Sequence, residues 1–391
     1  MRWLTNGYRS LQLDIIGFLA ILGEASVTAN AQVSLLSYIA LLPRLLPAPQ
    51  ALIRTSRPLT LAPATGKVIG ARSGGIRDFV NHIANLLHSR EALRDYHVRC
   101  ELIEKPDPSK SVEAATWGPL AYTSLLGTAM SVALLVLSIK KGDGFALLAT
   151  LLLSFLTSLI GFGSRWSLDL KKRESTRNVP PDKIVIKYPN GSFRIIVCKE
   201  EVARELYWHP EACNYFFSEG SYRIVSLIGT LTLMMGVVCL GNSTLDLQVA
   251  FGASYLILNA VYWAVAALPQ QLHWDLTCYK VSKVFYEGGE ESQTFTMALW
   301  KAIALAGSTQ WVVNGQVAPV SEGWKNWVKR AGDMVEIQGQ GLVPNGTANG
   351  MTDGMGEVQS EKMDGMTKDT PLQLPEWDPE KALTECLNPI D

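Results

Sequence analysis

The sequence predicts a mainly α-helical membrane protein: a four-span helical bundle of two hairpins with a small cytoplasmic α+β insert that contains a β-hairpin. Three observations predict this fold class: long apolar stretches, the distribution of basic residues, and one turn between β-branched runs. Four stretches contain no Asp, Glu, Lys, Arg or His, namely Leu120–Ile139, Phe145–Phe162, Ile224–Leu240 and Val249–Leu268. As a helix, each is long enough to cross a hydrocarbon core of ~30 Å.

The basic residues indicate the orientation of the spans. Ten Lys and Arg residues lie in 47–117, ten in 163–222 and nine in 269–391. The connection between the first two spans holds only Lys140 and Lys141, and the connection between the last two holds none. Because basic residues collect on the cytoplasmic side, both short loops are expected to face away from the cytoplasm. The soluble mass and the C-terminus are then cytoplasmic, at the plasma membrane or an endomembrane.

The clearest local pattern lies between the second and third spans. Lys183–Tyr188 and Phe193–Cys198 are β-branched runs on either side of Pro189–Ser192. The Asn-Gly pair in that turn accepts the positive φ angles of a type I′ turn, so a β-hairpin is predicted. A short charged helix is expected at Lys199–Tyr207. A hairpin and one helix bury little surface alone, so this insert should pack against 47–117 or the C-terminal part.

The remaining segments are assigned around the spans. They are an apolar N-terminal segment at 1–50, interfacial or inserted in the membrane, a cytoplasmic helical segment at 51–117, the first hairpin of spans at 118–163, the insert at 164–222, the second hairpin at 223–268, cytoplasmic and partly interfacial helices at 269–337, and a disordered tail at 338–391. Helical spacing of apolar residues predicts an amphipathic helix at 76–90. Two more helices are expected at His273–Tyr286 and Thr294–Leu305, and Trp300 beside Lys301 is typical of an interfacial helix. The tail is rich in Gly, Asn, Thr, Met and acidic residues.

The N-terminal segment allows three interpretations. Leu11–Leu22 and Val33–Leu46 are apolar, but Asp14 and Arg44 interrupt or flank them. A signal peptide would use Ala29–Ala31 as its small-x-small cleavage site. A tilted span or re-entrant pair is the second interpretation, and an interfacial helix is the third. We favour the third because it buries no charge in lipid.

Composition and motifs exclude several classes of function. A net charge of −1 and the lack of a long basic run argue against a nucleic-acid partner. The six cysteines show no CxxC spacing, and the five on the predicted cytoplasmic side are expected to be reduced thiols. Cys239 lies near the outer end of the third span, and neither outer loop offers it a partner. Gly66-Lys67 is followed by Val68, whereas a phosphate-binding loop needs Ser or Thr there. We therefore predict no cofactor, no metal and no catalytic motif.

Two polar pairs are candidates for a site at the interface. Glu205 and His209 stand at i and i+4, and they share one helix face if the predicted helix extends as far as His209. A metal needs at least one further ligand, and none is nearby. His273 and Asp275 follow the fourth span, where a His–Asp contact could do acid–base work, although spacing marks no nucleophile. Asn259 lies at membrane depth, where a hydrogen bond to a neighbouring helix is its simplest role.

Two further features concern lipids and assembly. A basic cluster lies just inside the second span, where it fixes topology and can contact anionic lipid. Its members are Arg165, Lys171, Lys172 and Arg173. Gly127 with Ser131, and Ala260 with Ala264, are small-residue pairs that let helices approach closely, either within the bundle or in a homo-oligomer.

Three runs carry a resemblance to a protein group. Ala203–Tyr207, Leu258–Trp263 and His273–Asp275 resemble uncharacterised multi-pass membrane proteins of filamentous fungi, over about residues 115–290. The resemblance implies a fungal membrane protein and carries no assigned activity or functional residue.

These observations lead to a non-enzymatic membrane scaffold or adaptor as the expected function. The alternative is an oligomeric channel or carrier for a small solute, which a duplicated hairpin would favour: Ser124–Thr128 and Ser226–Thr230 are similar and open equivalent spans. An enzyme at the interface would require His209 and His273 to meet a carboxylate in one cleft.

Overall fold

The computed structural model describes residues 24–54, 56–88, 92–170, 182–339 and 372–387. The chain forms two compact units, which we describe separately. The helical unit comprises Met1–Thr60, Ser111–Asp169 and Ala212–Thr277. The α/β unit comprises Leu61–Lys110, Leu170–Glu211 and Cys278–Asp391.

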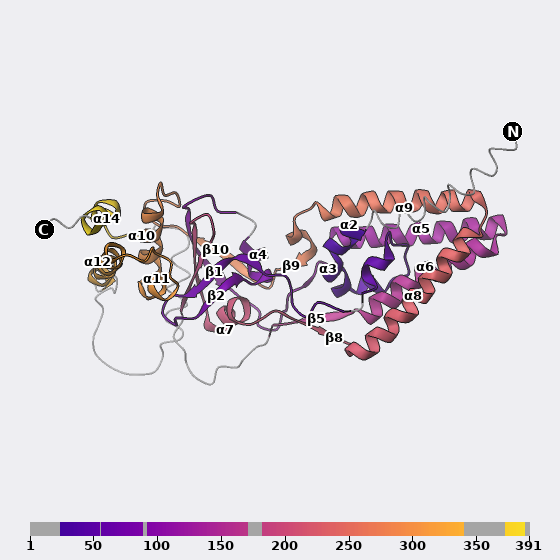
Figure 1. Ribbon diagram of the computed structural model, residues 1–391, viewed down its shortest axis with the longest axis horizontal. Helices are drawn as coiled ribbons and strands as arrows, with labels where there is room; N and C mark the ends of the chain where they lie inside the picture. Colours follow the sequence, from indigo (N-terminus) through magenta and orange to yellow (C-terminus); the bar gives the residue numbers. More distant parts are fainter. Residues whose placement is uncertain (1–23, 55, 89–91, 171–181, 340–371, 388–391) are drawn as a thin grey trace. The chain divides into compact units, whose positions relative to one another are not determined.

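The described part of the helical unit contains four helices that are long and apolar enough to cross a membrane, at the predicted places. They are α5 (Pro119–Lys141), α6 (Gly144–Gly163), α8 (Glu219–Gly241) and α9 (Leu245–Ala266). Helix α5 packs against both α6 and α9, and α6 packs against α8 (Figure 1). Apolar side chains fill the space between these helices. They include Leu134, Leu153, Cys239, Leu240, Phe251 and Leu258.

The N-terminal segment folds into short helices that pack on the long ones. These are α2 (Glu24–Ala29), α3 (Ala31–Leu36), η1 (Tyr38–Leu41) and η2 (Pro49–Leu52). A six-residue helix is about 9 Å long, so the described residues of Val33–Leu46 do not form a membrane span. The segment packs into the helical unit rather than forming one separate interfacial helix, because η1 contacts α6 and α2 contacts α9. Residues 1–23, with Asp14, lie outside the described part.

Two short strand pairs complete the helical unit. Strand β4 (Glu113–Ala114) pairs with β9 (Trp274–Asp275), and β5 (Trp166–Asp169) pairs with β8 (Ala212–Tyr215), both antiparallel. Each pair joins segments that lead into or out of the long helices. A turn of helix, η4 (Gln270–His273), precedes β9.

The α/β unit is built on one six-stranded sheet, with the strand order β10-β3-β7-β6-β1-β2. The strands are β1 (Ala64–Gly70), β2 (Ile76–Val80), β3 (Val98–Glu104), β6 (Lys183–Lys187), β7 (Phe193–Cys198) and β10 (Lys280–Val284). Strands β3 and β7 are parallel, and the other neighbours are antiparallel. The predicted insert thus packs against both candidate partners, because it supplies the two central strands of a sheet that they complete.

The predicted β-hairpin is confirmed, but its turn is not of type I′. Gly191 has φ +75°, whereas Asn190 is not among the described residues with positive φ. The Gly191 amide donates to the Tyr188 carbonyl at 3.1 Å, and the Tyr188 amide donates to the Ser192 carbonyl at 3.0 Å. Pro189 explains the difference, because its ring fixes φ near −65°, which suits a type I turn followed by a left-handed glycine.

The amphipathic helix predicted at 76–90 is wrong in its first half. The chain forms β2 and then α4 (His82–His88), while residues 89–90 lie outside the described part. Helix α4 begins at His82 because the carboxylate of Glu211 accepts the amides of His82 and Ile83, each at 2.8 Å. A cap from a residue so distant in sequence is invisible to local periodicity, which therefore placed the start too early.

The segment after the fourth long helix also differs from prediction. His273–Tyr286 is not a helix, since it contains η4's last residue, β9 and β10. Helix α10 (Phe295–Ala306) is present, yet it is buried in the core of the α/β unit rather than interfacial. The ammonium of Lys301 donates to the carbonyls of Gly288, Gly289 and Glu291, at 2.6 to 3.0 Å, which lets this cation lie inside protein.

The α/β unit contains further helices among the described residues. They are α7 (Glu200–Ala203) with the π-turn η3 (Arg204–Trp208), α11 (Gln310–Asn314), α12 (Glu322–Gly339) and α14 (Pro379–Leu387). The first of these confirms the helix predicted at Lys199–Tyr207, and α12 and α14 pack against α10. The disordered tail is wrong for 372–387, which pack on the unit, and residues 340–371 and 388–391 lie outside the described part.

Candidate functional site

The four residues of the candidate interfacial site fall in different units. Glu205 and His209 belong to the α/β unit, and His273 and Asp275 belong to the helical unit. Among the described residues, no group of three or more His, Cys, Asp or Glu side chains could hold a metal ion. Each pair is therefore described in its own surroundings.

Glu205 is buried and forms an ion pair. Its Oε1 atom lies 2.6 Å from the Nζ atom of Lys105, and both side chains are less than a tenth exposed. That ammonium lies 5.4 Å from the ring centroid of Tyr279. Burial, together with the negative charge of Glu205, raises the pKa of Tyr279. The carboxylate thus stabilises a buried cation within the α/β unit.

His209 lies where η3 ends, and its main-chain amide and carbonyl form hydrogen bonds. Its amide donates to the Arg204 carbonyl at 2.9 Å, an i to i−5 bond that closes the π-turn. Its carbonyl accepts a hydrogen bond from the Asn81 side chain at 2.7 Å. Because the π-turn widens the helix, Glu205 and His209 do not have the α-helical i, i+4 geometry that would place them on one helix face.

Asp275 is exposed and caps its own turn. Its Oδ1 atom accepts the Thr277 amide at 3.0 Å and the Thr277 hydroxyl at 2.6 Å. The ring nitrogens of His273 form no hydrogen bond to Asp275 in the described part of the chain. The His–Asp contact that acid–base work would need is therefore not formed between these two side chains.

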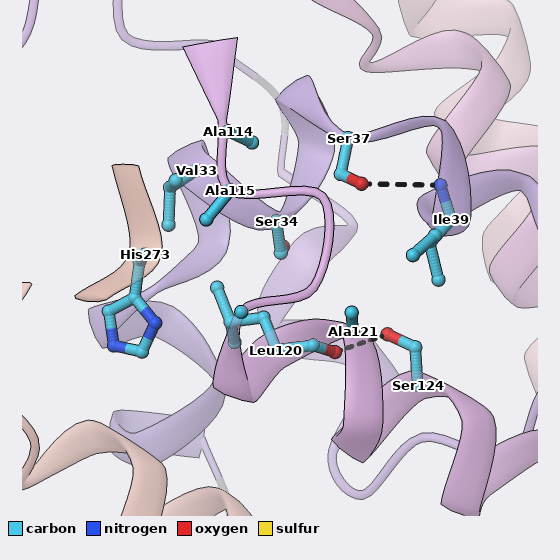
Figure 2. Close-up of a pocket in the computed structure, with 11 residues that line it drawn as sticks. Val33, Ser34, Ser37, Ile39, Ala114, Ala115, Leu120, Ala121, Ser124 and His273 are labelled. Carbon is cyan, nitrogen blue, oxygen red and sulfur yellow. Dashed lines mark hydrogen bonds between the residues drawn. The ribbon is translucent and has the colours of Figure 1, made fainter. Parts of the chain in front are cut away.

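His273 lines a small pocket at the end of the helical unit where α5 begins (Figure 2). Its side chain is 2% exposed. The other lining residues come from α3, η1, β4 and the first turns of α5. They include Val33, Ser34, Ser37, Ala114, Leu120 and Ser124. The cavity has a volume of about 10 Å³, enough for one water molecule.

The polar groups of this pocket are a neutral imidazole and serine hydroxyls. Burial lowers the pKa of His273, which favours the neutral imidazole with one donor and one acceptor nitrogen. Ser34 and Ser124 donate their hydroxyl protons to the carbonyls of Ala31 and Leu120, at 2.9 and 2.8 Å. Neither serine is hydrogen-bonded to the imidazole in the described structure, so no activated nucleophile is formed.

A second buried polar group in the α/β unit has no counterpart in the sequence predictions. His88 Nδ1 lies 3.0 Å from Glu101 Oε2, and His88 Nε2 lies 2.7 Å from the Tyr207 hydroxyl. Arg194 Nη1 pairs with the other oxygen of Glu101, and its Nη2 donates to the His88 carbonyl at 3.3 Å. We call these four residues the buried network.

The ionisation of the buried network follows from its contacts. Burial would raise the pKa of Glu101, but the hydrogen bond from His88 and the charges of Arg194 and Arg99 outweigh it and lower that pKa. Burial lowers the pKa of His88 and raises that of Tyr207 well above its ordinary value. The network thus holds one carboxylate against one guanidinium, bridged to a tyrosine by an imidazole. Charged residues inside the β-branched runs of β3 and β7 are the signal that reveals it in sequence.

Arg44 is a buried charged residue of the helical unit that the sequence did not mark as a candidate site residue. It is 3% exposed, and its main chain exchanges hydrogen bonds with the Thr157 hydroxyl at 3.2 and 3.0 Å. Its Nη1 atom donates to the Ile39 carbonyl at 2.9 Å. Gly127 of α5 makes this close approach possible, because a Cβ atom there would lie 2.7 Å from the Leu45 carbonyl oxygen.

The other predicted polar residues lie as follows. Asn259 accepts a hydrogen bond from Ser26 of α2 at 3.5 Å, so its side chain contacts the N-terminal segment. Arg165 stacks over the ring of Tyr38, 4.0 Å from its centroid. The three other basic residues of the predicted cluster, Lys171, Lys172 and Arg173, lie outside the described residues.

Comparisons with known proteins add no assignment to these sites. No protein-family model, no curated protein and no solved structure matches the chain. Function must therefore be inferred from the residues and contacts described above.

Proposed function

We propose that this chain is a multi-pass membrane adaptor: its long helices anchor in a lipid bilayer, and its α/β unit binds a partner at the cytoplasmic face. The observation that carries this proposal is the origin of the six-stranded sheet. Its strands come from three chain segments: one before α5, one between α6 and α8, and one after α9. One sheet cannot form across a bilayer, so each pair of long helices must return the chain to the same side.

The turns between the long helices support the same arrangement, in which each pair of helices returns the chain to one side. Asp143 Oδ2 accepts the Thr244 amide at 2.7 Å, and Lys141 Nζ lies 2.8 Å from Asp246 Oδ2. These contacts join the α5–α6 turn to the α8–α9 turn, so both turns lie at one end. The asymmetry of Lys and Arg then favours the cytoplasm for the opposite end, from which the strands of the sheet continue.

The surface of the helical unit fits a lipid environment. Large apolar side chains of α8 and α9 are exposed, including Ile224, Leu227, Leu231, Met234, Val249, Leu256 and Ile257. Trp117, Tyr122 and Trp263 are exposed near the beginning of α5 and the end of α9. Aromatic residues of this kind anchor proteins at the level of the lipid headgroups.

An adaptor is favoured over a pore by the contacts inside each unit. The space between the long helices is packed with apolar side chains, including Leu134, Leu153 and Phe251. In the α/β unit, Glu101 and Glu205 are engaged by Arg194 and Lys105 rather than facing a cavity. These buried charges are paired inside the α/β unit, so we assign partner binding to the outer surface of that unit.

The proposal is tested with a photo-crosslinking residue in the full chain, in native membranes. Asp78 and Val320, both strongly exposed in the α/β unit, are the test positions, and Gly142 in the α5–α6 turn is the control. We expect discrete adducts with another protein from the two test positions and none from the control. In parallel, liposomes containing the purified chain should leak ions no faster than empty liposomes. Solute-selective flux without adducts would establish the pore or carrier instead.

A further inference from the structure

Helices α10 and α12 carry three tryptophans that form one aromatic surface in the α/β unit. Trp324 and Trp327 of α12 lie 5.3 Å apart between ring centroids, at a steep angle. Trp300 of α10 and Trp327 both contact a fourth ring, Trp377, at centroid distances of 4.5 and 5.5 Å. Trp377 comes from a separate segment of the chain, which follows residues 340–371. We call the α10–α12 surface with its three tryptophans the aromatic platform.

Residues 372–387 occupy the aromatic platform, and they begin by pairing with main chain. The Leu372 amide donates to the Phe285 carbonyl at 3.1 Å, and the Glu287 amide donates to the Leu372 carbonyl at 2.9 Å. Leu372 thereby forms a parallel bridge with Tyr286, immediately after β10. One edge of the sheet region thus binds an extended segment through backbone hydrogen bonds, as in β-strand addition.

The tryptophan and the helix that follow supply the anchor. The Trp327 indole nitrogen is buried and donates to the Pro379 carbonyl at 2.8 Å, where α14 begins. Ala382 of α14 is buried against the platform. Gly323 of α12 admits the end of α14, because a Cβ atom there would lie 2.7 Å from the Leu387 side chain and 3.0 Å from the Cys386 carbonyl oxygen.

Charged contacts surround this apolar centre. The Thr294 hydroxyl donates to Glu380 Oε1 at 2.6 Å, and Arg330 Nη1 lies 3.1 Å from Glu385 Oε2. Both acceptors are acidic residues of α14, and their partners stand at the margins of the platform. The partly buried ring of Trp377, set against two buried tryptophans within a rim of polar contacts, matches the arrangement of peptide-recognition surfaces.

We propose that the aromatic platform is a peptide-binding site, and that residues 372–387 are its built-in ligand. The partner it fits is a protein segment of the same chemistry: an extended leucine, a tryptophan, and then an acidic amphipathic helix. That such a partner exists rests on the proposed adaptor function. The contacts of residues 372–387 with the platform are observed in the structure. The built-in ligand belongs to the same chain as the platform, so an outside segment must compete with an intramolecular ligand.

The test uses the full chain with a protease site introduced at Gly350. A fluorescent peptide of residues 371–391 is added before and after cleavage, and its binding is followed by anisotropy. Cleavage removes the intramolecular advantage, so the peptide should bind the cleaved chain about 100-fold more tightly than the intact chain. A peptide with Trp377→Ala should bind at least about 10-fold more weakly than the unchanged peptide. The matched control is Glu376→Ala, at an exposed position, which should change binding less than twofold.

Three results would overturn the inference. Failure of the peptide to exchange into the cleaved chain would make 372–387 a permanent part of the core. Equal binding of the Trp377→Ala and Glu376→Ala peptides would exclude the tryptophan anchor. A dimer of the intact chain that Trp377→Ala dissolves would identify a second copy as the occupant in place of another protein. None of these results depends on the crosslinking experiment, so failure of the docking site and failure of the adaptor function are distinguishable.

Discussion

Gly127 shows how a single residue determines the packing of the N-terminal segment. The Leu45 amide donates to the Gly127 carbonyl at 3.2 Å, and a methyl group at Gly127 would meet the Leu45 carbonyl oxygen. We predict that Gly127→Ala destabilises the helical unit by about 1–3 kcal/mol, because main chain must move to make room. Thermal unfolding of the purified protein in detergent measures this loss.

The control for that substitution is Gly252 in α9. A Cβ atom there would meet nothing within 4 Å, so Gly252→Ala should be neutral or stabilising by up to about 1 kcal/mol through helix propensity. Equal melting temperatures for the two variants would show that the segment around Arg44 does not pack against α5 as described. The small-residue pair of Gly127 and Ser131 is used within the unit, since Ser131 and Ser154 also form a hydrogen bond.

Glu211 makes the stability of the α/β unit depend on pH. Burial raises its pKa from 4.5 to about 7, although two amides of α4 donate to the carboxylate. The folded protein therefore binds this proton more tightly than the unfolded chain, and the stabilisation is complete below pH 4.5. It is lost as the pH rises to about 7, at a cost of about 3 kcal/mol.

The measurement compares unfolding of the natural chain and Glu211→Gln between pH 4.5 and 8, by tryptophan fluorescence. The difference in unfolding free energy between the two proteins should change by about 3 kcal/mol across this range, with the natural chain losing stability as pH rises. A pH-independent difference would mean that Glu211 is ionised in the fold throughout. The sequence gives no sign of this residue's role, because its partners lie 128 and 129 positions away.

Strands β3 and β7 depend on the buried network that joins them to α4 and η3. In Glu101→Gln, the guanidinium of Arg194 stays buried without a counter-charge, and we expect a loss of about 3–5 kcal/mol. Hydrogen exchange at the amides of β3 and β7 should rise accordingly. Glu104→Gln is the matched control at the end of β3, since its carboxylate is half-exposed and lies 3.9 Å from Lys280.

The control should change stability by less than about 0.5 kcal/mol, as for other surface pairs. Similar hydrogen exchange in the two variants would contradict a structural role for the network. Recovery of protection in a Glu101→Gln variant that also carries Arg194→Met would support it, because the buried charge is then gone.

Elements with strong local signals are predictable from this sequence, and elements fixed by distant contacts are not. The long apolar helices and the 183–198 hairpin follow from composition and turn residues alone. By contrast, β2 requires pairing with β1, β10 requires pairing with β3, and α4 begins where Glu211 caps it. Helix α10 resembled an interfacial helix because Lys301 adjoins Trp300, yet three main-chain carbonyls solvate that lysine inside the protein.

The same reasoning applies to the candidate sites. Spacing brought Glu205 to notice but could not reveal its partner Lys105, which lies 100 positions earlier. His273 lies two positions from Asp275 in the sequence, whereas in the structure its imidazole lines a pocket of about 10 Å³ and forms no hydrogen bond to that carboxylate. Residues 372–387 have the polar composition of a disordered tail, with Trp377 as their aromatic residue. Their fold depends on contacts of that ring with tryptophans of α10 and α12, which local composition does not reveal.

At the scale of the whole molecule, we propose that the α/β unit, which is assembled from segments before, between and after the pairs of long helices, lies on the cytoplasmic side of a membrane. Labelling of single cysteines with a membrane-impermeant maleimide tests this most directly. The test substitutions are Lys140→Cys and Asn242→Cys in the two short turns, and Asp78→Cys and Lys110→Cys in the α/β unit, all exposed. Reagent is applied to each face of the membrane in turn, in a chain with Cys386→Ser, because the five other cysteines are buried.

We expect the two turn positions to react from one face only, and the two α/β positions to react only from the cytosolic face. Reaction of Lys140→Cys and Asn242→Cys from opposite faces would contradict the even number of crossings that the sheet requires. Reaction of Asp78→Cys from the face that labels the turns would contradict the orientation, and with it the cytoplasmic partner.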